Sequence, residues 1–169
     1  MKTISLDNIL DNALQTDVML VILFSLCSMW CCQILKVIIS SIIKKSLQWK
    51  LLFSTGGFPS SHTSFVVTVT LLIGLLQMLK YDGLDWSFAV SFVFACIIIH
   101  DAMGVRLEAS KHAKILNNMT NEIPHEEKVE LGFGKKGQLK EMLGHKGYEV
   151  LGGVVVGILF AVIGYFVCI

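Results

Sequence analysis

Residues 64–79, SFVVTVTLLIGLLQML, form an apolar run that closely follows the motif GGFPSSH at residues 56–62. A helix of about 20 apolar residues can span the roughly 30 Å hydrocarbon layer of a membrane. The first backbone N–H groups of such a helix have no partner within it, so they favour a bound anion. This stretch therefore predicts a membrane helix with an anion site at its start.

The composition of the whole chain supports a membrane location. Hydrophobic residues make up 54% of the 169 residues and charged residues only 16%, and the mean hydropathy is +0.68. A soluble domain carries about 25% charged residues. The net charge is +1 and there is no basic tract, so we expect no nucleic-acid partner.

Three other apolar segments accompany the first, at about residues 18–35, 87–99 with a continuation to 105, and 150–168. We therefore predict an all-α membrane helical bundle of about four transmembrane helices over residues 18–169, preceded by an amphipathic segment at residues 1–17. The glycine-containing, charge-rich stretch at about residues 117–137 predicts a mobile loop. Of the 14 Lys and Arg residues, 12 lie in the connections 36–63 and 101–148, which places both connections in the cytoplasm by the positive-inside rule.

Polar residues gather at one end of the predicted bundle. They stand where the first and third spans end and where the second and fourth begin: Lys36, residues 56–62, Asp101, Arg106, His145 and Glu149. Because successive spans alternate in direction, all of these ends face the same side of the membrane. Ionisable groups at membrane depth tend to face a bundle interior or a wet cavity. The pattern predicts one shared polar site.

Each of these groups also has a purely structural interpretation. Lys36 can simply extend to the lipid headgroups, and residues 59–61 can form only a helix cap. Asp101 can pair with Arg106, and His145 with Glu149. Lys111 and His112 can be solvated charges.

The same residues suit phosphoryl transfer, which needs cations and N–H donors around the phosphate, a nucleophile in line and an acid for the leaving oxygen. His145 and His62 can divide the roles of nucleophile and acid, and Glu149 lies one helical turn from His145 and can orient its imidazole. The candidates for binding phosphate are Lys36, Gly56, Gly57, Ser60, Ser61, Arg106 and Lys111. No cluster has the spacing of metal ligands, so we expect no metal.

Four separated motifs, in this order, resemble a known family. They are Gln33 with Lys36, GGFPSSH at 56–62, DAMGVR at 101–106 and LGH at 143–145, the last extended by GHKGYEVLGG at 144–153. From about residue 20 to the C terminus the chain resembles the small divergent membrane branch of the type 2 phosphatidic acid phosphatase and vanadium haloperoxidase superfamily. The resemblance implies that His62 is the general acid and that Ser60 and Ser61 hold the phosphate.

The superfamily's third motif has an arginine six residues before the nucleophilic histidine and an aspartate four residues after it. His145 has Glu149 at the second distance but lacks the arginine, whereas His112 has Arg106 at the first distance but lacks the acid. The choice of nucleophile stays open, and we favour His145 because of its carboxylate. The superfamily's first motif is absent, and Lys36 is the substitute that we expect.

We hypothesise a metal-independent phosphatase that acts on a lipid-linked phosphate or pyrophosphate through a phosphohistidine intermediate. Because two motifs depart from the superfamily pattern, the alternative is a non-catalytic membrane protein that binds or transports phosphorylated lipids. We expect no cofactor, with vanadate acting only as a phosphate mimic. The expected partners are membrane lipids and the phosphorylated lipid itself, and a homodimer is one arrangement that would shield four short spans.

Overall fold

The computed structural model describes residues 6–54, 56–133, 137–141 and 144–168, with the backbone alone at residues 6–15 and at Lys50. Its helices in chain order are α1 (Leu6–Lys44), the 3-10 helix η1 (Trp49–Phe53), α2 (Ser61–Tyr81), α3 (Trp86–Met103), α4 (Val105–Met119), α5 (His125–Glu130) and α6 (Gly147–Cys168). These residues contain no strand, and four helical stretches are long and apolar enough to span a membrane: Thr16–Lys44, Ser61–Tyr81, Trp86–Met119 and Gly147–Cys168. The prediction of an all-α, multi-pass membrane protein with four spans is confirmed.

The helices run past the boundaries expected from the sequence. α1 is continuous from Leu6 to Lys44, so the segment expected at residues 1–17 leads directly into the first span, and residues 1–5 lie outside the described residues. α4 follows α3 after a break at Gly104. α5 lies within the stretch that was expected to be a mobile loop at residues 117–137, of which residues 134–136 are outside the described part.

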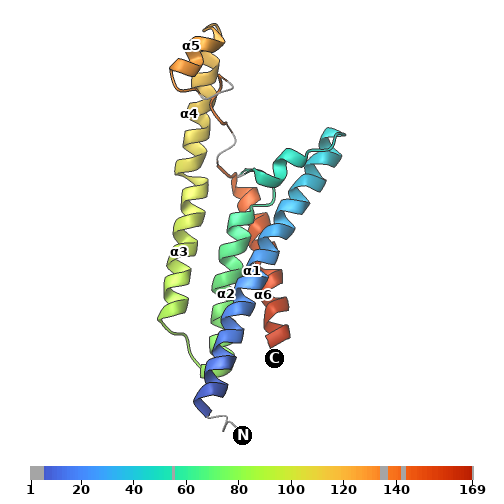
Figure 1. The fold of residues 1–169 in the computed structure, drawn as a ribbon, viewed down its shortest axis with the longest axis vertical. Helices are drawn as coiled ribbons and strands as arrows, with labels where there is room; N and C mark the ends of the chain where they lie inside the picture. The colour runs from blue at the N-terminus through green and yellow to red at the C-terminus, as the bar shows by residue number, and fades with distance from the viewer. Residues whose placement is uncertain (1–5, 55, 134–136, 142–143, 169) are drawn as a thin grey trace.

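The molecule divides into two parts (Figure 1). α1, α2 and α6 pack against one another as a three-helix bundle, and α3 with α4 forms a long column beside it that contacts the bundle mainly through α2. Both chain termini lie at one end of the molecule (Figure 1). The end of α1, the start of α2, the junction of α3 with α4 and the start of α6 therefore lie toward the other end, which we call the site end.

Small residues bring α6 close to α2 in the three-helix bundle. Gly153, Gly157 and Ala161 recur every four residues along α6 and are buried. A Cβ at Gly157 would lie 2.8 Å from the Ser64 carbonyl oxygen, and a Cβ at Gly153 would overlap the Ser60 carbonyl oxygen. Lipid tails are as apolar as the helix surfaces, so close van der Waals contact has to hold membrane helices together, and small residues allow it.

Buried hydroxyl groups also join the three helices of the bundle. Thr68 of α2 places its Oγ1 3.0 Å from Ser28 Oγ of α1 and 3.1 Å from the Gly157 carbonyl oxygen of α6. Ser28 in turn donates to the Ser25 carbonyl oxygen, 2.8 Å away. Because no water is present in a bilayer interior, an unpaired hydroxyl is costly there, and these contacts satisfy such groups.

The α3–α4 column is much less buried than the bundle. Among its described residues, the buried ones are Ala95 and Ala102 in α3 and Ala113 and Asn117 in α4. Its close contact with α2 lies away from the site end, where a Cβ at Gly74 would be 2.9 Å from the Phe88 ring. Large apolar side chains of α3 are exposed on several sides, which suits a helix surrounded by lipid.

Candidate functional site

His145 and Glu149 form a buried pair at the start of α6. The imidazole Nδ1 lies 3.1 Å from Glu149 Oε2, and the same oxygen accepts a hydrogen bond from the Lys146 N–H at 3.1 Å. The carboxylate favours the tautomer that carries its proton on Nδ1. Nε2 is then left with a free lone pair, and this atom is buried without a hydrogen-bond partner in the part of the chain that the structure describes.

Burial determines the protonation state of His145. The residue is 2% exposed, and this burial lowers the pKa of His145 below its ordinary value of 6.5. The hydrogen bond and the charge of Glu149 oppose the shift, whereas the charges of Lys36 and Arg106 add to it. The imidazole is therefore neutral at pH 7, which is the form that can attack an electrophile.

Lys36 of α1 lies beneath the glycine-rich turn that precedes α2. It is fully buried, and its Nζ donates to Gln33 Oε1 at 2.9 Å and to the Ser54 carbonyl oxygen at 3.3 Å. Gly57 has a φ of +102°, and a Cβ there would lie 3.2 Å from Lys36 Cδ, so glycine lets the turn pass closely over the lysine. An ammonium group has three N–H donors. Two of them meet partners in the described part of the chain, which leaves the third for a ligand.

The two serines at the start of α2 differ in their contacts. Ser60 is the N-cap, and its Oγ accepts hydrogen bonds from the Thr63 N–H at 3.4 Å and from the Thr63 hydroxyl at 2.9 Å. The Ser60 N–H donates to the Glu149 carbonyl oxygen at 2.9 Å, which joins the starts of α2 and α6. Ser61 Oγ is also buried, and it has no hydrogen-bond partner among the described residues. Ser64 Oγ, one turn later, is buried beside the Cys32 thiol. Ser61 therefore offers the hydroxyl that is available to a ligand.

His62 and Arg106 lie toward the exposed side of the site. His62 is exposed in the first turn of α2, within electrostatic range of both His145 and Arg106. Arg106 Nε donates to Asp101 Oδ2 at 2.5 Å across the break between α3 and α4, and the arginine side chain is half exposed. Binding an anion with Arg106 would require the guanidinium to share or exchange its carboxylate partner.

Gly56 and Lys111, two further residues predicted to bind phosphate, lie in different parts of the structure. Gly56 is buried in the turn before α2, where its carbonyl oxygen accepts a hydrogen bond from Ser54 Oγ at 3.0 Å. Lys111 pairs with Glu108 at 2.6 Å on the exposed surface of α4. No contact in the described part of the chain joins Lys111 to the other predicted site residues, so the structure does not bring it into the group.

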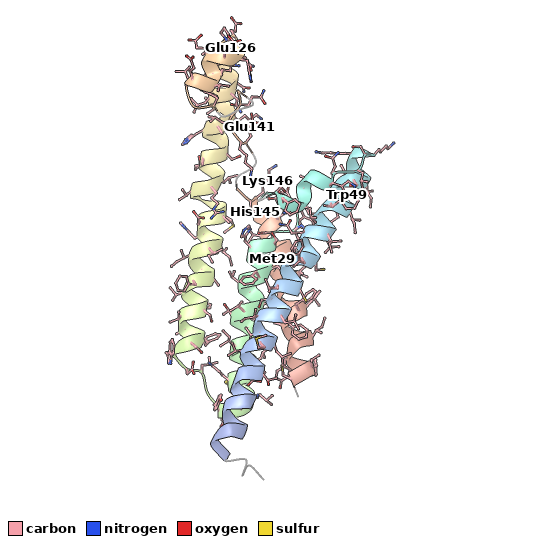
Figure 2. All side chains as sticks on the ribbon, in the orientation of Figure 1. Met29, Trp49, Glu126, Glu141, His145 and Lys146 are labelled. Carbon is pink, nitrogen blue, oxygen red and sulfur yellow. The ribbon has the colours of Figure 1, made fainter. Side chains whose placement is uncertain are left out.

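The segment that carries His145 is held along the α3–α4 column; we call residues 137–141 and 144–145 the return segment. Asn117 of α4 donates to the Leu139 carbonyl oxygen at 3.0 Å and accepts from the Leu139 N–H at 2.8 Å. At the other end of the segment, the His145 N–H donates to the Ala102 carbonyl oxygen at 3.0 Å. Figure 2 shows the labelled members of this path between the column and the start of α6: Glu141, His145 and Lys146.

Sequence reasoning missed Ser64 and the contacts of the return segment. Ser64 follows Ser61 by three residues, so helical spacing would have placed both hydroxyls on one face of α2. Asn117 carries no comparable signal, because its partner Leu139 is 22 residues away and apolar. Only the folded backbone shows that the two residues meet.

The donor set of the site matches an oxyanion. Lys36 contributes a buried cation and Ser61 a hydroxyl, which are the kinds of group that can stabilise the charge of an oxyanion. His145 contributes a nitrogen lone pair instead of a donor. The described residues contain no group of three or more His, Cys, Asp or Glu side chains arranged to hold a metal ion.

The chain is similar to known proteins over most of its length. The Divergent PAP2 family matches residues 18–160. A membrane protein of Bacillus subtilis (strain 168), described as uncharacterized and called YuiD, is 38% identical over an alignment that covers 86% of this chain and 94% of that protein. No solved structure gives a significant match.

Proposed function

The chain belongs to the divergent PAP2 family, and from this membership we propose that it is a metal-independent membrane phosphatase. Its substrate is a lipid-linked phosphate or pyrophosphate, because the candidate site lies at one end of membrane-spanning helices. The observation that carries the proposal is the Nε2 atom of His145, which is buried, oriented by Glu149 and without a partner among the described residues. The positive charge of Lys36 helps to lower the pKa of the same imidazole.

The proposed reaction has two steps. The lone pair of His145 Nε2 attacks phosphorus, the phosphorus–oxygen bond to the lipid breaks, and the leaving oxygen takes a proton from His62. Water then attacks the phosphohistidine and gives its proton to His62, which releases inorganic phosphate and restores both histidines. Lys36 and Ser61 stabilise the charge on the phosphoryl oxygens in both steps, which is the main source of acceleration in phosphoryl transfer.

The geometry supports His145 as the nucleophile over His112. His145 is buried against Glu149 in a neutral form, whereas His112 is exposed on α4. An exposed imidazole lacks the fixed orientation that an in-line attack requires. The site is proposed to face the cytoplasm, because 12 of the 14 Lys and Arg residues lie in the two connections at the site end.

The decisive experiment measures phosphate release by the purified full-length protein in mixed micelles that contain EDTA. Phosphatidic acid, a polyprenyl pyrophosphate and a water-soluble phosphate monoester form the panel, with vanadate as inhibitor. His145→Asn retains a donor toward Glu149 but removes the nucleophile, and His112→Asn is the matched control. We expect turnover of a lipid substrate by the wild type and the control, and none by His145→Asn. A phosphoprotein that is labile in acid and stable in base, and absent from His145→Asn, would identify the intermediate.

A second function is favoured by one observation: Arg106, which would complete the phosphate site, is already paired with Asp101 at 2.5 Å. A protein with this site could bind a phosphorylated lipid without hydrolysing it. The same experiment separates the two functions, since a pure binder would retain the lipid phosphate saturably and release none. Equal phosphate release by the wild type and His145→Asn would contradict the phosphatase mechanism.

The cytoplasmic location has its own test in a cysteine-free variant. Single cysteines in place of Asp82 and of Lys128 should react with a membrane-impermeant reagent from opposite sides of the membrane. Position 128 should react only from the cytoplasm. Labelling of position 128 from outside would reverse the proposed orientation.

A further inference from the structure

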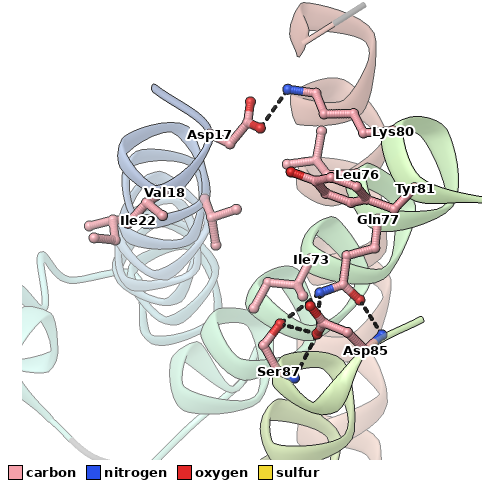
Figure 3. Close-up of a pocket in the computed structure, with 11 residues that line it drawn as sticks. Asp17, Val18, Ile22, Ile73, Leu76, Gln77, Lys80, Tyr81, Asp85 and Ser87 are labelled. Carbon is pink, nitrogen blue, oxygen red and sulfur yellow. Dashed lines mark hydrogen bonds and ion pairs between the residues drawn. The ribbon is translucent and has the colours of Figure 1, made fainter. Parts of the chain in front are cut away.

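A cavity lies at the end of the molecule opposite His145. Its volume is about 350 Å³, and its walls come from the first part of the α1 span, the end of α2 and the start of α3 (Figure 3). Pockets for small molecules span about 300–1,000 Å³, so this one can hold a headgroup and part of one acyl chain. None of the proposed catalytic or phosphate-binding residues lines it.

One wall of the cavity is apolar and one region is charged. Val18, Ile22 and Leu76 contribute to the apolar surface. Lys80 of α2 and Asp17 of α1 form an ion pair at 2.5 Å, and their side chains are 31% and 17% exposed. A lining of this kind suits an amphiphile whose charged part meets the pair and whose chain follows the apolar wall.

Three other polar residues of the wall, Gln77, Asp85 and Ser87, are hydrogen-bonded to one another. Gln77 Nε2 donates to Asp85 Oδ1 and to Ser87 Oγ, both at 2.6 Å, and Gln77 Oε1 accepts from the Asp85 N–H at 3.1 Å. Hydrogen bonds from Ser87 lower the pKa of Asp85, so this carboxyl is ionised at neutral pH. The network fixes the turn between α2 and α3, and it adds a negative charge to the lining.

The charges of the lining decide which headgroup fits. Asp17 and Asp85 are negative and Lys80 is positive, so a ligand with an anionic headgroup alone would meet one favourable and two unfavourable charges. A zwitterionic headgroup could place its phosphate at Lys80 and its ammonium at Asp17. A primary ammonium can also donate hydrogen bonds to the carboxylate, which a quaternary one cannot.

We propose that this cavity binds a zwitterionic membrane phospholipid with a primary ammonium headgroup, that is, a phosphatidylethanolamine. The ethanolamine ammonium pairs with Asp17, the phosphodiester pairs with Lys80, and one acyl chain lies against Val18, Ile22 and Leu76. The site is separate from the proposed phosphatase site, and the proposal does not depend on that function.

The test is lipid retention by the full-length protein, measured by native mass spectrometry after incubation in mixed micelles. The probes are phosphatidylethanolamine, phosphatidylcholine and phosphatidylglycerol with identical acyl chains. We expect the wild type to retain phosphatidylethanolamine at least about tenfold more than phosphatidylglycerol, since only phosphatidylethanolamine can donate a charged hydrogen bond to Asp17. Phosphatidylcholine should fall between them.

Two variants test the assignment in different ways. Asp17→Asn with Lys80→Gln removes both charges of the ion pair and should abolish the preference for phosphatidylethanolamine over phosphatidylcholine, while the charge of Asp85 remains. Ile22→Trp keeps the ion pair but fills the cavity from a half-exposed position, so it should lower retention of all three lipids without unfolding the protein. Lys44→Gln, at the other end of α1, is the matched control and should behave like the wild type.

The outcomes separate this site from the proposed function. His145→Asn should leave lipid retention unchanged, whatever its effect on phosphate release. Equal retention of phosphatidylglycerol and phosphatidylethanolamine by the wild type would overturn the proposal. Unchanged retention of phosphatidylethanolamine in Ile22→Trp, with an unchanged melting temperature, would do so as well.

Discussion

The three-helix bundle and the α3–α4 column contribute to the same site but are built differently. In the bundle, Gly153 and Gly157 let α6 approach α2 until backbone meets backbone, and Thr68 joins all three helices. In the described residues of the column, only four side chains are buried. Groups that need fixed geometry, such as Lys36 and Glu149, lie in the bundle, whereas Arg106 lies on the column.

This difference indicates that the site has a rigid half and an adjustable half. The buried groups of the bundle hold positions that depend on tight helix packing. The distance of Arg106 from them depends on how the column sits against the bundle, and the return segment is the connection between the two. The following substitutions separate these contributions, beginning with the one expected to have the largest effect.

Gly153→Val should disrupt the bundle. The added side chain would overlap the Ser60 carbonyl oxygen, and overpacking of a tight core costs about 1–3 kcal/mol or more. We expect a strongly lowered melting temperature by circular dichroism and faster alkylation of Cys32, which is fully buried in the native protein. Gly147→Ala is the control, because a Cβ at Gly147 meets nothing within 4 Å. Equal stability of both variants would show that the close approach of α2 and α6 is not needed.

Glu149→Gln should reduce turnover by on the order of 10²–10⁴-fold, because the imidazole loses the group that orients it. Turnover requires neutral His145, so the rate falls as the pH drops through the pKa of this residue, which burial places below 6.5. Glu149 raises that pKa, so the variant should have its acid limb at still lower pH. The pH–rate profiles of both proteins give the measurement. An acid limb above pH 6.5, or one that does not move, would contradict the assignment.

Arg106→Gln should raise KM by about tenfold with a smaller change in kcat. The reason is that a half-exposed cation that already pairs with Asp101 contributes less to stabilising the phosphoryl group than an unpaired cation would. Lys111→Gln is the matched control on the same helix and should change KM by less than about twofold. Initial-rate kinetics on the preferred lipid substrate provide the comparison. A larger effect at Lys111 would mean that the column approaches the bundle differently in the working protein.

Asn117→Ala should have the smallest effect, about 1 kcal/mol of local stability and a severalfold loss of turnover. It removes the hydrogen bonds to Leu139 that hold the return segment, while the His145–Glu149 pair stays intact. Hydrogen exchange at residues 137–141 should quicken in this variant but not in Asn118→Ala, whose side chain is exposed. Unchanged hydrogen exchange and turnover would show that these hydrogen bonds of the return segment do not fix the position of His145.

The sequence predicted the helical class and the four spans correctly. The segment at residues 87–105 shows the limit of such reasoning, because hydropathy marks its apolar part but not the continuation of the helix through α4 to Met119. Polar helical residues outside the membrane leave no hydropathy signal, and their helix depends on contacts such as that between Asn117 and Leu139.

Hydropathy and chain order by themselves determined that this is a membrane protein and that Lys36, Ser61 and His145 share one end of it. Both properties follow from the local sequence, because each apolar run must cross the bilayer and successive runs alternate in direction. The helix cap and the Asp101–Arg106 pair are local contacts that the sequence already offered as alternatives. Tertiary structure alone decided that Ser61 Oγ and His145 Nε2 are buried without a partner among the described residues. Which polar group remains available depends on the neighbours that packing supplies from distant parts of the chain, and no local pattern contains that information.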